Sequence, residues 1–156
     1  MTESVDGAVP PFAVWLRQAR RDLAAADSLH ATGHHEWACF CALQAAEKAQ
    51  KAIYHALEID PPRVQGRPGH DLNLLAKGWG SGVNAQPELA TAQSYLNQLS
   101  ESTRYPQPVH GRYVAPCDIY RETDSEKAIV HARKLVEFCE PLARKAATFW
   151  RSATQS

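Results

Sequence analysis

Apolar side chains recur at steps of three and four residues along most of this chain, which is the spacing of an amphipathic α-helix. The first stripe begins near Phe12, and Gly33 is a typical signal for the end of a helix. Its members are Leu16, Ala19, Leu23, Ala26 and His30. The pattern therefore predicts a first helix from about Phe12 to Gly33.

Alanine dominates a second helical stripe, which runs from about His35 to Leu57. Alanine is the best helix former, and its small side chain lets another helix approach closely. Residues 60–62, Asp-Pro-Pro, end the segment because the residue before a proline is pushed out of helical geometry. We expect Trp37, together with Trp15 of the first helix, to anchor the core. The stripe consists of Trp37, Cys41, Ala45, Ala49, Ala52 and Ala56, widened by Phe40 and Leu43.

Two shorter periodic segments follow in the middle of the chain. In HDLNLLAKG, Asp71 can cap a short third helix and Gly78 can close it. A fourth helix is predicted from near Pro87, a favoured first-turn residue, to about Thr103, and it stops before Pro106. Its buried stripe consists of Leu89, Ala92, Leu96 and Leu99.

A long last helix is predicted to open at the sequence TDSE. Thr123 and Glu126 have the spacing of a capping box. Pro141 lies inside the apolar seam, and because proline lacks a backbone donor we expect a kink or an early end there. Trp150 either helps a dimer contact, where aromatic residues are enriched, or packs against the tail. The seam consists of Ala128, Ala132, Leu135, Cys139, Leu142, Ala146 and Phe149.

The predicted elements define an all-α fold. No stretch alternates between apolar and polar residues well enough to predict a strand. The chain has 156 residues, which suits one domain with one core. We expect an up-and-down helical bundle of four longer helices plus one short helix over residues 12–151. Residues 1–11 are expected to form a flexible N-terminal arm, and residues 152–156 a tail.

Charge and cysteine content narrow the classes of function. The formal net charge is zero, whereas duplex-binding proteins carry a basic excess, so we expect no DNA duplex as a partner. The four cysteines form no Cys-x-x-Cys pair, and the start of the chain does not have the pattern of a signal peptide. No apolar run approaches membrane length. We therefore expect free thiols, a cytoplasmic location and no membrane contact.

The sequence offers little for a metal or a cofactor. His34, His35, Cys39 and Cys41 cluster, but residues two apart point to different sides of a helix. Structural zinc sites favour other spacings, so we expect no metal and interpret the cysteines as small core residues. The glycines follow no P-loop or dinucleotide-binding pattern, and no cofactor is expected.

The segment STRYPQPVHGRY, residues 102–113, carries the strongest candidate chemistry. Arg104 either bonds the last carbonyls of its own helix or binds an anion with its planar fork of donors. Tyr105 and Tyr113 either stack on a nucleotide base or pack with the phenol at the surface. We select Arg104, Tyr105, His110 and Arg112 as candidate nucleotide-binding residues.

Two lysines and a histidine lie outside that segment. Lys48 and Lys51 are on the second helix, in QAAEKAQKA, and each can reach a phosphate. The alternative for these two candidates is a solvated helix face on which Glu47 and Lys51 form an ion pair. His70 opens the third helix, where capping or packing is favoured over a role in a site.

Several of these motifs together resemble the HEPN domain family. They are the Gln44-Ala-Ala-Glu47-Lys48 core, the Gly69-His70-Asp71-Leu72 helix start, STRYP and the long closing helix. The resemblance covers the chain from about Phe12 to Trp150, and the runs WLRQAR and EWACF are especially similar to the HEPN domain at the C-terminus of sacsin, a large chaperone-related protein. It implies a bundle of up-and-down helices that forms a two-fold homodimer.

The resemblance implies two alternatives for function, because family members differ in activity. Some bind nucleotides without catalysis, as the sacsin domain does with purine nucleotides. Others pair with a small nucleotidyltransferase as a toxin–antitoxin system, and some are metal-independent ribonucleases with the signature Arg, four to six residues, then His. We favour the non-catalytic nucleotide-binding or protein-interaction module, acting as a homodimer.

Arg104 and His110 match the ribonuclease signature by count, with five residues between them. Metal-free cleavage of RNA needs a base for the 2′-hydroxyl, which histidine supplies, and a fixed cation for the developing phosphate charge, which arginine supplies. Pro106 and Pro108 lie between the two residues and cannot continue a helix. The prolines therefore favour a bent ligand loop, with binding preferred over cleavage.

Overall fold

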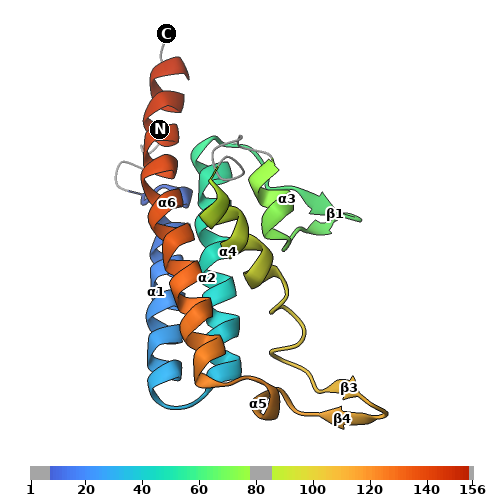
Figure 1. Ribbon diagram of the computed structural model, residues 1–156. Coiled ribbons are helices and arrows are strands. Elements are labelled where there is room, and N and C mark those ends of the chain that lie inside the picture. Colours follow the sequence, from blue (N-terminus) through green and yellow to red (C-terminus); the bar gives the residue numbers. More distant parts are fainter. Residues whose placement is uncertain (1–7, 78–85, 155–156) are drawn as a thin grey trace.

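A computed structural model describes residues 8–77 and 86–154, and within these ranges the chain forms six helices and two short hairpins (Figure 1). The expectations for the N-terminal arm and for Gly78 lie largely or wholly outside the described residues. The helices are α1 Pro11–Ala31, α2 His35–Ala56, α3 Leu72–Lys77, α4 Pro87–Asn97, α5 Pro116–Ile119 and α6 Glu122–Thr154. The strands are β1 Arg63–Val64, β2 Arg67–Pro68, β3 Gln107–Val109 and β4 Arg112–Val114.

The helices α1, α2 and α6 run side by side and form the body of the molecule (Figure 1). Helix α4 packs against α6 and α2, and α3 packs against both α2 and α4. The hairpin β3–β4 projects away from the bundle near the start of α6. This arrangement confirms the predicted all-α bundle. None of the helices in the described ranges is long and apolar enough to cross a membrane.

The core is built around the alanine-rich face of α2, as its sequence predicts. Six alanines of this helix are completely buried, and larger side chains from every neighbouring long helix close around them. The small side chains on α2 let α1 and α6 approach it closely. Leucines of the surrounding helices fill the space between the helices. These leucines are Leu16 of α1, Leu72 and Leu75 of α3, Leu96 of α4 and Leu135 of α6.

Helix α6 differs from its prediction at both ends. It begins at Glu122, so Thr123 is inside the helix, and the capping contact comes from the Asp124 carboxylate, which accepts a hydrogen bond from Arg121 N at 2.8 Å. The helix also continues past Pro141 to Thr154, so the early end is wrong and the predicted tail is partly helical. Beyond Pro141 the buried positions are Ala143 and Ala147, which leaves Phe149 69% exposed.

The two hairpins and α5 are not predicted by the periodicity. The hairpin β3–β4 turns at His110 and Gly111, whose φ angles of 48° and 80° are those of a type I′ turn. Strands of two or three residues are too short to show alternation in the sequence, which is why the pattern misses them. Trp37 is 45% exposed, so it does not anchor the core, whereas Trp15 is partly buried and packs against it.

Candidate functional site

Polar and aromatic side chains form a continuous stripe along one side of α2, and we call it the α2 stripe. Its residues recur every three or four positions, which places them on one face of the helix. Most are only partly buried, in contrast to the sealed alanine face. The stripe consists of Phe40, Gln44, Glu47, Lys48, Lys51 and His55.

Glu47 is the centre of the α2 stripe. Its carboxylate accepts a hydrogen bond from Lys51 Nζ at 2.6 Å, and the side chains of both residues are only 6% exposed. The same oxygen, Oε1, is 2.7 Å from His70 Nδ1, and Oε2 is 3.3 Å from the amide of Gln44. The predicted Glu47–Lys51 pair is therefore confirmed, but the predicted solvated face is wrong because the pair is buried.

The two lysines of the stripe point to different partners on α1. Lys48 Nζ forms an ion pair with Asp22 at 2.6 Å and donates a hydrogen bond to Gln44. Lys51 Nζ lies 5.9 Å from the centre of the Trp15 ring, and Trp15 stacks on His55 with ring centroids 4.9 Å apart. Both lysines are thus already neutralised by carboxylates within the chain. They have less charge available for an outside anion than the sequence suggests.

Arg104 lies beside the Phe40 end of the stripe. Its Nε donates a hydrogen bond to the carbonyl of Ser100 at 2.8 Å, as expected for a residue at a helix end. The guanidinium carbon is 4.9 Å from the ring centre of Phe40 and 5.2 Å from that of Tyr105. No hydrogen bond or ion pair to its two terminal nitrogens occurs within residues 8–77 and 86–154. The guanidinium is therefore fixed in place with free donors.

The other candidates of the segment 102–113 lie on the projecting hairpin. His110 occupies the tip of the turn, and Tyr113 is 77% exposed opposite Pro108. Pro106 and the strand β3 lie between Tyr105 and His110, and five extended residue steps span on the order of 16 Å. Within the described part of one chain, no hydrogen bond, ion pair or ring contact joins Arg104 to His110 or Arg112. The hairpin thus separates what the sequence places close together.

His70 has a different role from the predicted capping or packing. Asp71 caps α3 instead, because its Oδ1 accepts hydrogen bonds from Asn73 N at 2.8 Å and Leu74 N at 3.4 Å. The His70 side chain is 66% exposed and is held by Glu47 across the gap between α2 and the start of α3. Sequence reasoning missed this pair, although an acidic residue in an apolar, alanine-rich helix is a signal that it has a partner.

Three cavities adjoin the α2 stripe. One of about 250 Å³ is lined by His70, Asp71, Asn97 and Ser100, and it lies next to the Glu47–His70 pair. The other two, of about 190 and 260 Å³, lie on either side of Trp15, beside Lys51 and Lys48 respectively. Of the residues predicted from the sequence, Arg104 lies at the Phe40 end of the stripe and Lys48 and Lys51 lie further along it; the structure adds Glu47 and His70.

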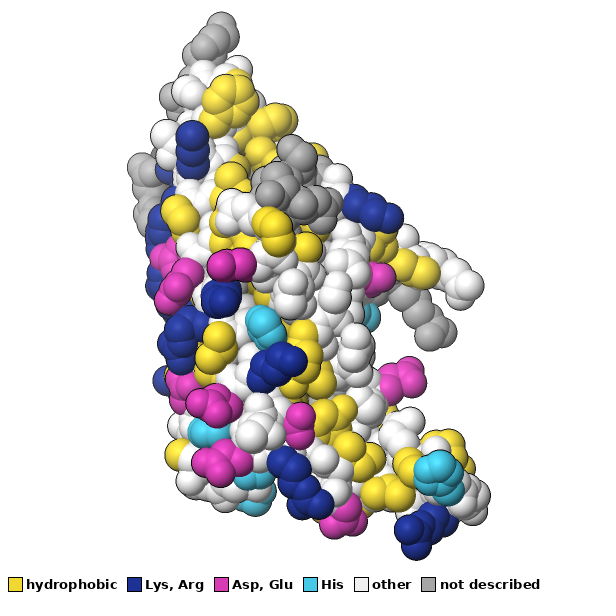
Figure 2. Space-filling model, in the orientation of Figure 1, with side chains coloured by type: hydrophobic (Ala, Val, Ile, Leu, Met, Phe, Trp, Pro, Cys, Tyr) yellow, Lys and Arg dark blue, Asp and Glu magenta, His cyan; other side chains and the backbone are white. Residues whose placement is uncertain are grey.

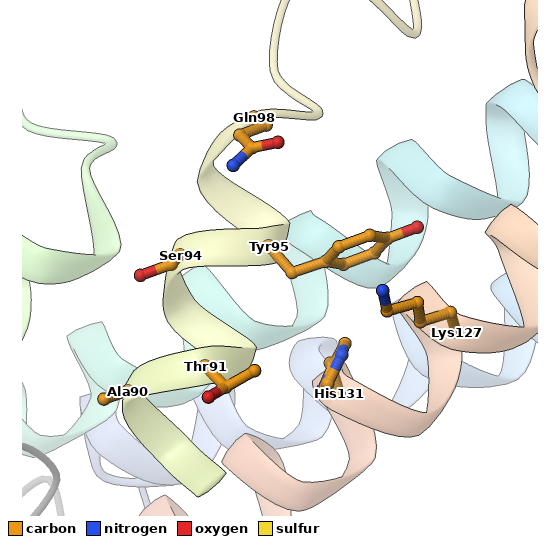
Figure 3. Close-up of a pocket in the computed structure, with 7 residues that line it drawn as sticks. All are labelled: Ala90, Thr91, Ser94, Tyr95, Gln98, Lys127 and His131. Carbon is orange, nitrogen blue, oxygen red and sulfur yellow. The ribbon is translucent and has the colours of Figure 1, made fainter. Parts of the chain in front are cut away.

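A groove of about 420 Å³ between α4 and α6 lies apart from these residues (Figure 3). Lys127 Nζ lies 4.6 Å from the ring centre of Tyr95, and the ring of His131 lies 5.1 Å from the same ring. Burial raises the pKa of Tyr95 to about 12, while burial and the nearby Lys127 and Lys134 lower the pKa of His131. Neither ring nitrogen of His131 has a hydrogen-bond partner among the described residues.

The predicted histidine–cysteine cluster is divided between core and surface. His30 and His35 both place Nδ1 on the hydroxyl of Ser125, at 2.7 and 2.9 Å. Cys39 is buried, and burial, with Asp124 and Glu36 nearby, raises its pKa to about 12. All four cysteines are free thiols. No group of three or more metal-binding side chains occurs in the ranges that the structure describes.

Charged side chains are mixed over the surface. Figure 2 shows acidic and basic groups interspersed along the long helices, without a single basic field. On the hairpin β3–β4, residues 107–114 contain a histidine and an arginine but no acidic residue. A small local site for an anion is thus compatible with this surface, whereas a broad cationic face is not present in the view shown.

Comparison with known proteins shows the family. The HEPN domain model matches residues 12–142, so this chain belongs to the HEPN domain family. None of the curated proteins compared with the chain matches it.

Solved structures agree with this assignment. The chain is 29% identical to TT1696 from Thermus thermophilus, with a TM-score of 0.74 over 86% of this chain and 99% of that one. It is 26% identical to ST0689, an archaeal HEPN homologue, with a TM-score of 0.67 over 85% and 97% of the two chains. A HEPN domain protein from Thermotoga maritima, at 24% identity and a TM-score of 0.61 over 82% and 95%, shares the fold.

Proposed function

We propose that this protein is a non-catalytic nucleotide-binding and protein-interaction module that acts as a homodimer in the cytoplasm. The observation that carries the proposal is Arg104, whose Nε is fixed on Ser100 and whose guanidinium lies against Phe40 and Tyr105. A planar fork with free terminal donors suits a phosphate oxygen, and it needs little reorganisation to bind one.

Aromatic side chains beside Arg104 support a nucleotide rather than a bare anion. Tyr105 is 58% exposed at the same corner, and an exposed ring face can stack on a base. The resemblance of WLRQAR and EWACF to the sacsin HEPN domain points to a purine nucleotide as ligand. His110 and Arg112 remain candidates for further phosphate contacts, whereas Lys48 and Lys51 would first have to leave Asp22 and Glu47.

Thermal unfolding in the presence of ATP or GTP tests the proposal. A ligand that binds the native state raises the melting temperature, and a concentration 100 times Kd corresponds to about 2.7 kcal/mol. We expect a shift for the wild type at millimolar nucleotide, and a much smaller shift for Arg104→Ala. Arg17→Ala is the matched control, because Arg17 is exposed on α1. A wild type that shows no shift with either nucleotide contradicts the proposal.

The alternative function is a metal-independent ribonuclease, as in the toxin of a pair with a small nucleotidyltransferase. The observation that favours it is that His110 and the Arg104 terminal nitrogens are both unbonded within the described residues and accessible to a partner. A two-fold dimer would have to bring His110 of one copy to Arg104 of the other. RNA cleavage in chelator, lost in both Arg104→Ala and His110→Ala, would support it, and cleavage by either variant would exclude this pair.

A further inference from the structure

The pair formed by Glu47 and His70 has no part in the proposed function. Glu47 is buried and His70 is exposed, and their side chains meet at 2.7 Å beside the cavity of about 250 Å³. A buried carboxylate that holds an exposed imidazole fixes the orientation of the ring. Such a ring presents its other nitrogen in a defined direction.

The hydrogen bonds of Glu47 determine which atom of His70 carries a proton. Oε1 of Glu47 also accepts a hydrogen bond from the Lys51 ammonium, so this oxygen is an acceptor toward His70 as well. Nδ1 of His70 must therefore donate, and in the neutral ring Nε2 is left as an acceptor. Among the described residues no hydrogen bond reaches Nε2, which is free to accept one from a ligand.

The character of the cavity indicates which part of a nucleotide would fit there. Its lining contains no phenylalanine, tyrosine or tryptophan on which a base could stack, and the one ring there, His70, is held by Glu47. The carboxylates of Asp71 and Glu47 lie in or beside it and would repel a phosphate. A sugar remains, because its hydroxyl groups donate to carboxylate and imidazole acceptors, and acidic residues bind ribose hydroxyls in dinucleotide-binding folds as well.

The position of Arg104 agrees with a sugar in the cavity and a phosphate outside it. Arg104 lies over Phe40 and His70 is held by Glu47, and these two positions are two turns apart, about 10 Å, along α2. One phosphate group cannot contact both residues at hydrogen-bond distance. Ser100 connects the two ends, because its carbonyl binds Arg104 while the residue itself lines the cavity.

We propose that the cavity at His70 is a ribose subsite, in which Nε2 of His70 and the carboxylate of Asp71 accept hydrogen bonds from the sugar hydroxyls of a nucleotide whose phosphate binds Arg104. This inference rests on the proposed nucleotide binding and names the form of nucleotide that the site selects. The ligand is a ribonucleotide, in preference to one that lacks the hydroxyl groups.

Titration of the wild-type protein with ATP, GTP and their 2′,3′-dideoxy forms tests the subsite. Loss of the hydroxyl groups removes the hydrogen bonds to His70 and Asp71, and we expect binding about tenfold weaker for the dideoxy forms. This comparison needs no variant, so it does not depend on the folding of one. Equal affinity for both forms overturns the ribose subsite and leaves the proposed nucleotide binding intact.

Variants assign the effect to His70. His70→Ala should lower affinity for the ribonucleotide and reduce its preference over the dideoxy form, while affinity for the dideoxy form stays unchanged. Arg104→Ala should weaken the binding of both forms by the same factor, because the substitution removes the contact with the phosphate. If His70→Ala keeps the tenfold preference, the subsite is elsewhere. If no nucleotide binds the wild type, the proposed function itself fails.

Discussion

At the scale of single residues, burial separates the charged side chains of this protein into two kinds. Glu47 and Lys51 are almost completely buried together, whereas Asp27 and Arg133 pair at the surface with side chains about half exposed. The sequence does not show which of the two pairs is buried. A Glu–Lys pair four residues apart on a helix usually lies in solvent. The α2 helix is enclosed by α1 and by the start of α3, and this enclosure makes the pair structural.

Removal of one partner from the buried pair should therefore be costly. Glu47→Ala leaves the Lys51 ammonium buried and also releases His70, so we expect a loss of about 3–5 kcal/mol in the free energy of unfolding in urea. The double change Glu47→Leu with Lys51→Met removes both charges and should cost less than Glu47→Ala alone.

The surface pair is the control for that measurement. Asp27→Ala breaks the contact with Arg133 and should change the free energy of unfolding by less than about 1 kcal/mol. A similar loss of unfolding free energy for Asp27→Ala and Glu47→Ala would show that burial does not make the Glu47 pair more important for stability.

At the scale of helices and hairpins, length decides what the sequence pattern can predict. The starts and ends of α1 and α2 follow closely from apolar spacing, because a stripe of five or more members identifies a face. The hairpins and α5 contain too few residues for any period to appear. In α6 the buried positions beyond Pro141 are Ala143 and Ala147. The seam members Leu142 and Ala146 are partly buried, and the predicted seam is wrong at Phe149.

The contact between α4 and α6 should make stability depend on pH. Burial, with Lys127 and Lys134 nearby, lowers the pKa of His131, so the folded state favours the neutral ring. The unfolded chain then binds more protons below a pH of about 6.5, and stability falls as the pH decreases through that value toward the lowered folded pKa. We expect the melting temperature of His131→Phe to fall less than that of the wild type between pH 7 and pH 5.

An exposed histidine provides the control for the pH dependence of His131→Phe. His34→Phe should retain the pH dependence of the wild type, because His34 is exposed at the turn between α1 and α2. His131→Phe sacrifices no hydrogen bond, since both ring nitrogens lack partners within the described ranges. Identical pH profiles for His131→Phe and the wild type would mean that the groove does not disfavour the charged imidazole.

At the scale of the whole molecule, the proposed homodimer would cover surface that the single chain leaves open. Phe149 and Trp37 are exposed on α6 and α2, and Val14 of α1 is exposed beside Lys48. Light scattering after gel filtration should give twice the chain mass of 17.3 kDa. A mass of 17.3 kDa at micromolar concentration would contradict the dimer, and it would also remove the geometry that the ribonuclease alternative requires.

The sequence alone determined the helical class, the long helices and the family resemblance, because helix periodicity and alanine content are local properties of the chain. It also placed Arg104 in the candidate site. Only the tertiary structure decided which polar groups meet there. His110, six residues from Arg104 in sequence, projects on a hairpin, while His70 and Glu47, far apart in sequence, share a hydrogen bond. Contacts of that kind depend on how helices pack, and no local pattern records them.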